Sequence, residues 1–241
     1  MATGPQKDYV TRTVQGRAEA ADIDVGLRAH MQKVFSLMGL GTAITGLVAF
    51  FTAQSPTLLQ AIYETPLRWV VFLAPFGFIL ALSFGLQRMR ASTAQLVFWA
   101  FAGVMGLSLA SIFLVYTGQS IVTTFFVSSA TFFAMALYGY TTKRDLTGWG
   151  SFLFMGLIGL IIASIVNIFV ASTALQFAIS AIGVLIFTGL TAYDTQKIKE
   201  MYWAGDDSET GGKKAIMGAL ALYLDFINLF LYLLRFIGDR R

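Results

Sequence analysis

Two aspartates stand in apolar segments of this sequence, where a charged side chain is unusual. Asp225 lies within the apolar segment 219–234, and Asp194 follows Tyr193 near the end of the preceding apolar segment. A carboxylate at the middle of a bilayer costs about 2.5 to 3.5 kcal/mol even on the lenient insertion scale, so such an acid usually faces the interior of a helix bundle. Intramembrane acids are typical of ion pathways and proton relays.

The two aspartates act as a pair if their helices are neighbours. Two carboxyl groups within hydrogen-bonding distance in a low-dielectric interior do not both ionise easily, so Asp194 and Asp225 would share one proton. Such a pair changes its charge with pH and offers oxygen ligands, which favours a proton sensor or a direct contact with a cation such as Ca2+. The alternative is structural, with each aspartate only capping or pinning its helix.

Other polar residues are candidates to support this pair. Asn228 lies three residues after Asp225 and shares its helix face, where its amide is a candidate hydrogen-bond partner. Tyr193 directly precedes the other aspartate.

Arg88 and Arg90 end the second apolar segment. Arginines at such places usually anchor a span at the cytoplasmic surface. Arg88 is also a candidate latch, a counter-ion that keeps one aspartate ionised until protonation releases it. The sequence leaves open which of the two arginines takes that role.

The composition indicates a membrane protein. Hydrophobic residues make up 56% of the 241 positions, charged residues only 12%, and the mean hydropathy is +0.70. A soluble fold of this length would not bury so much apolar surface. Apolar segments of about 20 residues span lipid as helices, because a helix satisfies its own backbone hydrogen bonds. Cysteine is absent and His30, before the first span, is the only histidine, which excludes thiolate metal sites and histidine triads in the membrane.

Seven apolar segments predict seven transmembrane helices. We expect the spans at residues 34–53, 69–87, 93–115, 121–142, 149–171, 175–196 and 215–237. Residues 1–33 are predicted to be a polar cytoplasmic leader, without the apolar core of a cleavable signal peptide. Residues 34–241 are predicted to form one seven-helix membrane domain.

The distribution of basic residues predicts the orientation. Most of the 17 Lys and Arg residues fall on the side of the amino terminus, which the positive-inside rule places in the cytoplasm. With seven complete spans the carboxyl terminus lies outside, although Arg240 and Arg241 fit that side poorly. A last segment that re-enters and leaves on the cytoplasmic side is the alternative.

The depths of the two aspartates are predicted to differ. If the last helix begins near Ala215, Asp225 lies about 15 Å into the membrane, whereas Asp194 lies close to the cytoplasmic boundary. The carboxyl groups then meet only if the sixth helix continues past Lys199, if the last helix begins later, or if water reaches inward between them. We favour the long sixth helix or a water-filled cytoplasmic vestibule.

Among enzymes, an intramembrane aspartyl protease is the serious alternative. Such a protease pairs Tyr-Asp on its sixth helix with Gly-x-Gly-Asp on its seventh. Tyr193 and Asp194 fit the first motif, but residues 222–224 are Leu-Tyr-Leu where the second motif needs glycines. A phosphate-binding glycine loop, an HExxH zinc motif and a lysine in the middle of the last span are also missing from the sequence. We therefore expect no enzyme.

Two segments of the sequence resemble the signatures of a known family. Residues 192–197, Ala-Tyr-Asp-Thr-Gln-Lys, and residues 222–230, Leu-Tyr-Leu-Asp-Phe-Ile-Asn-Leu-Phe, are similar to motifs of the transmembrane Bax inhibitor motif family. Residues 138–146, Tyr-Gly-Tyr-Thr-Thr-Lys-Arg-Asp-Leu, resemble its bacterial members. The similarity covers essentially the whole membrane region, and the motif in the last helix is quite specific.

The resemblance implies a fold and an activity. The fold is six helices around a central seventh, and the activity is a pH-sensitive calcium leak gated by an aspartate pair with an arginine latch. Asp194 and Asp225 map onto the pair, and Arg88 maps onto the latch. Some relatives carry an acidic residue in the second helix that is linked to ion passage, whereas residues 69–87 contain none.

The leading hypothesis is a passive, pH-gated leak for cations, foremost Ca2+, in which protonation of the pair shifts the second helix relative to the last. A non-conducting regulator of membrane proteases or stress responses is the alternative, followed by the aspartyl protease. No resident cofactor is expected, since Ca2+ would be the transported ion. We expect the lipid bilayer, a cation and other membrane proteins as partners, no nucleic acid, and a location in a bacterial inner membrane.

Overall fold

The computed structural model describes the backbone of residues 6–241 and the side chains of residues 25–241. Helices account for the regular structure of this part of the chain: α1 Gln6–Ala53, α2 Pro56–Tyr63, α3 Leu67–Gly85, the 3-10 turn η1 Leu86–Arg88, α4 Ala91–Leu109, α5 Ile112–Val115, α6 Gly118–Thr141, α7 Thr147–Val170, α8 Thr173–Glu200 and α9 Ser208–Ile237. Within the described residues, 7 helical segments are long and apolar enough to cross a membrane. The predicted all-α integral membrane fold with seven spans is therefore confirmed.

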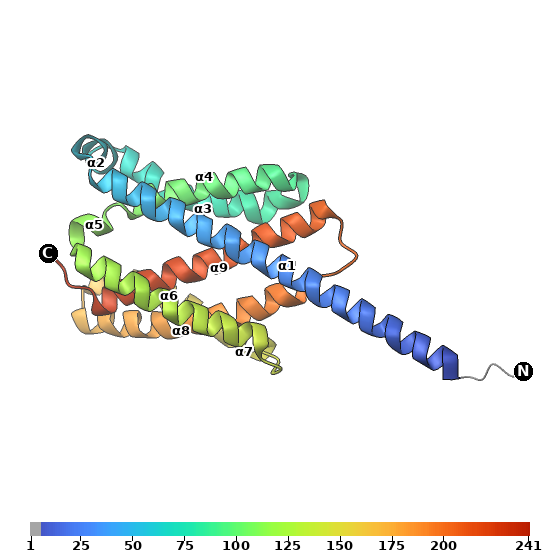
Figure 1. Cartoon of the computed structure of the whole chain (residues 1–241). Coiled ribbons are helices and arrows are strands. Elements are labelled where there is room, and N and C mark those ends of the chain that lie inside the picture. Colours follow the sequence, from blue (N-terminus) through green and yellow to red (C-terminus); the bar gives the residue numbers. More distant parts are fainter. Residues whose placement is uncertain (1–5) are drawn as a thin grey trace, which may run out of the picture.

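The seven spans alternate in direction, and the ends of the chain lie at opposite ends of the bundle (Figure 1). The start of α1, the turn between α3 and α4, and the loops after α6 and α8 lie at one end, which the positive-inside rule predicts to be cytoplasmic. The last span, α9, is one continuous helix of 30 residues. The re-entrant alternative for the last segment is therefore wrong.

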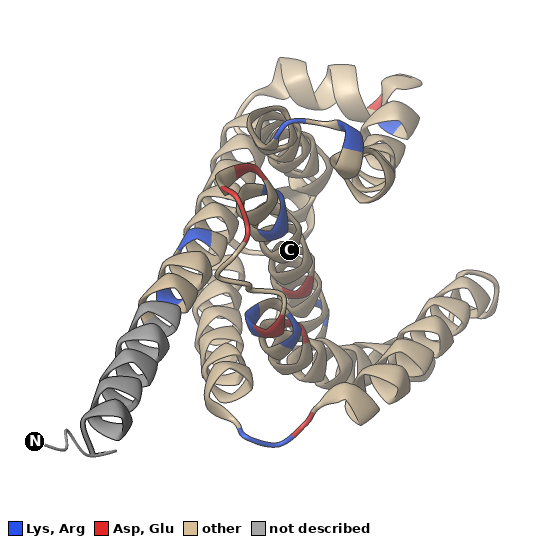
Figure 2. Cartoon of the chain, turned by 90° about the vertical axis from the view of Figure 1, so that its right-hand side faces the viewer, with Lys and Arg blue, Asp and Glu red and all other residues tan. Residues whose placement is uncertain are grey.

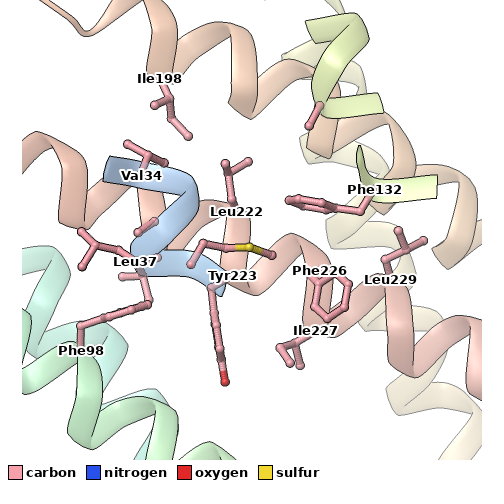
Figure 3. Close-up of a cluster of buried hydrophobic side chains, with 14 of the residues drawn as sticks. Val34, Leu37, Phe98, Phe132, Ile198, Leu222, Tyr223, Phe226, Ile227 and Leu229 are labelled. Carbon is pink, nitrogen blue, oxygen red and sulfur yellow. The ribbon is translucent and has the colours of Figure 1, made fainter. Parts of the chain in front are cut away.

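The helix α9 forms the centre of the bundle. In its most apolar window 61% of the residues are buried, against 11% to 33% in the other spans. It packs directly against α1, α4, α6 and α8, while α3 packs on α4 and α7 on α8. Figure 3 shows residues of α9 packed among side chains of the surrounding helices, with Tyr223 and Phe226 in the middle of the cluster. The expected central last helix is thus present, with four helices directly around it and two outside them.

Tyr223 joins three helices at this centre. Its side chain is fully buried, and its hydroxyl lies 2.6 Å from the Thr45 hydroxyl of α1. Its ring packs edge-on against Phe98 and Phe101 of α4. A buried tyrosine with both its ring and its hydroxyl satisfied is well suited to hold a membrane core in one arrangement.

The carboxyl-terminal arginines are tied to the connection between α5 and α6. Arg241 N donates to Val115 O at 2.9 Å, Thr117 N donates to Asp239 O at 3.1 Å, and Asp239 N donates to Ser120 Oγ at 2.9 Å. The Arg240 guanidinium lies 6.0 Å from the centre of the Tyr116 ring. These contacts hold the basic tail at the end of the bundle opposite to the start of α1. That end is the predicted outer side, where the arginines do not fit the positive-inside rule.

Seen from the end of the bundle at which α1 begins, charged residues occupy only short stretches of the described helices (Figure 2). The first helix differs from its prediction, because α1 is already helical before residue 34. His30 is therefore part of the bundle, where it is buried with its ring 5.8 Å from that of Tyr202. The remaining part of the predicted leader, residues 1–24, lies outside the described side chains.

The close approach of α6 to α8 leads to a stability prediction. A Cβ atom at Gly139 would collide with the backbone of Ala192, whereas nothing lies within 4 Å of a Cβ at Gly159 on α7. We expect Gly139→Ala to lower the free energy of unfolding by about 1 to 3 kcal/mol through overpacking. The matched Gly159→Ala should leave it unchanged or raise it by up to about 1 kcal/mol, because alanine favours helix. Thermal unfolding of both variants in detergent, followed by tryptophan fluorescence, measures this difference, and equal midpoints would contradict the packing.

Candidate functional site

The antiparallel helices α8 and α9 place Asp194 opposite Asp225. Near the loop between the helices, Gly218 packs against Ile198, and farther along Tyr232 packs against Gly183. The two aspartates lie between these contacts, at one level of the hairpin. Their carboxyl groups are hydrogen-bonded to each other.

The predicted difference in depth does not exist, because both helices are longer than the apolar pattern indicates. The helix α8 includes Lys199 and ends at Glu200, as the long-helix solution requires. The helix α9 begins at Ser208, earlier than expected, so the solution in which it starts late is wrong. Since Gly218 is level with Ile198, the first turns of α9 extend beyond the end of α8.

Capping explains the early start of α9. The Asp207 carboxylate accepts a hydrogen bond from Thr210 N at 2.7 Å, which satisfies one free N–H of the first turn. Hydrogen bonding by Thr210 also holds the pKa of Asp207 below its usual range. The polar residues of this stretch are therefore helical, although their composition is typical of a loop.

A cavity of ≈ 760 Å³ opens beside the aspartate pair. Four helices contribute its walls, and polar residues gather around the pair while the remaining surface is apolar. The lining residues are Phe76 and Ile79 of α3, Gly150, Ser151, Phe154, Leu157 and Ile161 of α7, Phe187, Leu190, Tyr193, Asp194 and Lys197 of α8, and Ala221, Leu224, Asp225, Asn228 and Tyr232 of α9. This cavity is the candidate for the predicted water-filled vestibule.

The burial of the pair limits the charge it carries. Asp225 is 4% exposed, and its Oδ2 has no hydrogen-bond partner within the described part of the chain. A hydrogen bond between two carboxyl groups requires a proton on one of them. The arrangement is therefore compatible with a proton shared by the pair, and Asp225 Oδ2 is left without a partner beside the cavity.

Lys197 is the basic residue that faces the pair. It lines the cavity one helical turn after Asp194, and its positive charge acts on that carboxyl group. Arg88, the predicted latch, ends η1 with an exposed side chain and does not line the cavity. Arg90 is likewise exposed. The structure thus does not bring either arginine to the aspartates.

The two other predicted residues both line the cavity. Asn228 shares the face of Asp225 as expected, but its Nδ2 donates to Leu224 O at 2.8 Å, one turn back on its own helix. Tyr193 packs flat against α7, where its ring occupies the space of a side chain at Gly150. Asn228 therefore offers its amide oxygen to the cavity, and Tyr193 separates the pair from the outer helix.

Hydrogen bonds hold the α6–α7 loop against α8 next to this site. The Gln196 side chain accepts from Leu146 N and donates to Arg144 O, both at 2.8 Å. Lys199 Nζ donates to Tyr140 O at 2.9 Å. These bonds fix the end of α8 that carries Asp194 and Lys197, so the site has one rigid wall.

The site differs from a resident metal centre. The residues that the structure describes contain no group of three His, Cys, Asp or Glu side chains able to hold a metal ion. Two carboxyl groups with the oxygens of Asn228 and Tyr193 provide fewer ligands than the six to eight that Ca2+ takes.

Sequence reasoning missed Lys197, Phe187 and Tyr232. The three-residue spacing between Asp194 and Lys197 was the available signal, since residues at that spacing share a helix face. Phe187 and Tyr232 stack with their ring centres 5.6 Å apart at the end of the cavity farthest from Lys197. Aromatic residues are frequent in these helices, so no pattern singled out these two.

Comparison with known proteins covers nearly the whole chain. The family described as inhibitor of apoptosis-promoting Bax1 matches residues 27–241. An uncharacterized protein of Rickettsia prowazekii is 49% identical over 234 residues, which are 97% of this chain and 99% of that protein. The inner membrane protein YbhL of Escherichia coli K12 is 45% identical over 219 residues, 90% of this chain and 94% of YbhL. An uncharacterized membrane protein of Streptococcus pyogenes is 35% identical over 217 residues, 89% of this chain and 94% of that protein.

The cavity leads to a prediction of water access. The sequence contains no cysteine, so a single introduced thiol reports on one position. Ala221 lines the cavity, while Ala219, two residues away on α9, is fully buried in the core. We expect Ala221→Cys to react with a membrane-impermeant thiol reagent added on the cytoplasmic side, and Ala219→Cys to remain unreactive. Mass spectrometry of inverted membrane vesicles measures both, and a folded Ala221→Cys variant that does not react would mean that the cavity is dry.

Proposed function

The chain belongs to the family of the inhibitor of apoptosis-promoting Bax1, and we propose that it is a pH-sensitive passive leak for cations, foremost Ca2+, in a bacterial inner membrane. The observation that carries the proposal is the hydrogen-bonded pair of Asp194 and Asp225 on the wall of a cavity between four spans. The name of the relative YbhL supports the inner membrane as the location.

The pair supplies the sensitivity to pH. With one shared proton it carries a single negative charge, and it gains or loses charge when it takes up or releases a proton. Such a change at a site buried between packed helices alters the electrostatic balance with Lys197. Protonation of the pair therefore favours one of two arrangements of the helices. The change of arrangement opens or closes the pathway.

The helix α3 is the wall able to move. It packs mainly on α4, away from the central helix, and contributes only Phe76 and Ile79 to the cavity. The opposite wall consists of α8 and α9, which pack closely along their length. A shift of α3 would widen the cavity without breaking the core around Tyr223. The proposed gating movement is therefore the predicted shift of the second span relative to the last, without the arginine latch.

The ligands in the cavity support a cation as the permeating species. Carboxylate and amide oxygens of Asp225 and Asn228 attract cations and can replace part of a hydration shell. A weak site favours flux, because an ion that binds tightly does not leave. The pathway is passive in this proposal, since the described residues include no nucleotide-binding or redox site to couple it to an energy source.

Neutralising the central acid tests the proposal. We expect purified protein in liposomes loaded with a calcium dye, assayed at several values from about pH 5 to pH 8, to leak Ca2+ at a rate that changes with pH as the pair takes up or releases its shared proton. Asp225→Asn removes the proton-sharing pair while keeping the shape of the side chain, and adding Asp194→Asn removes the remaining carboxyl group. The leak rate of the double variant should be the same at every pH in this range.

The matched control is Asp207→Asn, which keeps a good helix cap far from the cavity and should behave as the unaltered protein. A leak that is absent at every pH, or one that Asp225→Asn does not alter, overturns the channel proposal. An absent leak together with an intact cellular phenotype would favour the non-conducting regulator. Cleavage of a membrane peptide that Asp→Asn at either site abolishes would favour the protease.

A further inference from the structure

A polar stripe continues along α9 beyond the aspartate pair. Asp225, Asn228, Tyr232 and Arg235 follow one another at spacings of three, four and three residues, so they share one face of the helix. Elsewhere the membrane part of α9 is almost entirely apolar. The stripe leads from the pair toward the end of α9 at which the chain terminates, opposite to the start of α1 (Figure 1).

Aromatic rings close this stripe. The rings of Phe187 and Tyr232 stack with their centres 5.6 Å apart and their planes at 21°, and both line the far end of the cavity. Beyond them, the exposed Arg235 places its guanidinium 5.7 Å from the centre of the Tyr232 ring. A cation that leaves the pair in this direction therefore meets an apolar constriction and then a positive charge.

We propose that Phe187, Tyr232 and Arg235 form the outer gate of the cation pathway. The proposal rests on the proposed function, because a gate needs a pathway, and it adds the residues that close the pathway on the side away from the cytoplasm. The stacked rings exclude water from the passage, and a dewetted constriction stops ions without a covalent plug. The guanidinium is held over the Tyr232 ring by a cation–π contact, and its charge repels a second cation in the exit.

Gly183 sets the closed position of the gate. The Tyr232 ring lies directly on the α8 backbone at this residue, and a Cβ there would meet the ring at 2.5 to 2.8 Å. A ring edge cannot give way easily when it is stacked on Phe187 and packed against a helix. Gly183→Ala therefore displaces the gate while leaving all three of its side chains present.

The first experiment measures access and does not depend on ion flux. Ala221→Cys provides a thiol in the cavity, and an impermeant thiol reagent is added only on the outer side of right-side-out vesicles. We expect little labelling with the gate intact. Adding Tyr232→Ala or Gly183→Ala should raise the outer labelling rate roughly tenfold, because the aromatic stack no longer seals the cavity. Adding Gly159→Ala, whose Cβ points into open space, should leave the rate unchanged.

The second experiment measures Ca2+ leak in liposomes. Arg235→Gln removes the charge and the cation–π contact, and we expect it to raise the leak about two- to fivefold, whereas Arg235→Lys should restore the original rate. An unchanged outer labelling rate in folded Tyr232→Ala and Gly183→Ala protein overturns the gate. Labelling that responds to these variants while no variant leaks at any pH leaves the gate standing as a barrier to water and overturns the leak. A pH-dependent leak, together with an outer labelling rate that the gate variants do not change, supports the leak and overturns the gate.

Discussion

The cost of placing a carboxyl group inside a bundle of apolar helices constrains the rest of this structure. Asp225 stands on the most buried span, so lipid cannot surround it and the neighbouring helices must supply a partner. That partner is a second acid, Asp194, and in the proposed function the two acids share one proton. Each member then depends on the other, and the proposed leak needs the cavity to let a proton reach them. The fold is organised to keep α8, α9 and this cavity in place.

Close backbone contacts make this arrangement possible. The helix α6 approaches the backbone of α8 at Gly139. The Tyr232 ring of α9 lies on Gly183 of α8. On the side of α7, Tyr193 of α8 fills the space beside Gly150. Without a hydrophobic driving force between helices in lipid, such small residues allow the van der Waals packing that holds spans together. The rigid side of the cavity is therefore the side built on glycines, and none of these glycine contacts involves α3.

The sequence predicted the seven spans, the central last helix and the two acids, because apolar length and an isolated charge in lipid are strong physical signals. It did not predict the helix ends near the cytoplasmic side. Residues 208–214 are polar, and hydropathy cannot distinguish a capped polar helix from a loop. This error gave Asp225 and Asp194 different predicted depths in the membrane. A contact between their carboxyl groups therefore needed a special explanation. Arg88 was predicted as the counter-ion and Lys197 was not considered for that role, since the side to which a residue at a helix end turns depends on tertiary packing.

The weakness of the site as a metal site is consistent with the proposed leak. A pathway conducts only if an ion binds well enough to enter and poorly enough to leave. In the proposed leak, the two carboxyl groups share one negative charge, and Lys197 and Asn228 line the same cavity. A cation there meets only a shallow minimum of free energy. A full set of acidic ligands would instead trap Ca2+ as calcium buffers do. The absence of an acid in α3 has the same effect, since Asp194 and Asp225 are then the only acids among the described residues that line the cavity. In the proposed leak, control of flux then falls to the proton on the pair and to the proposed gate at Tyr232.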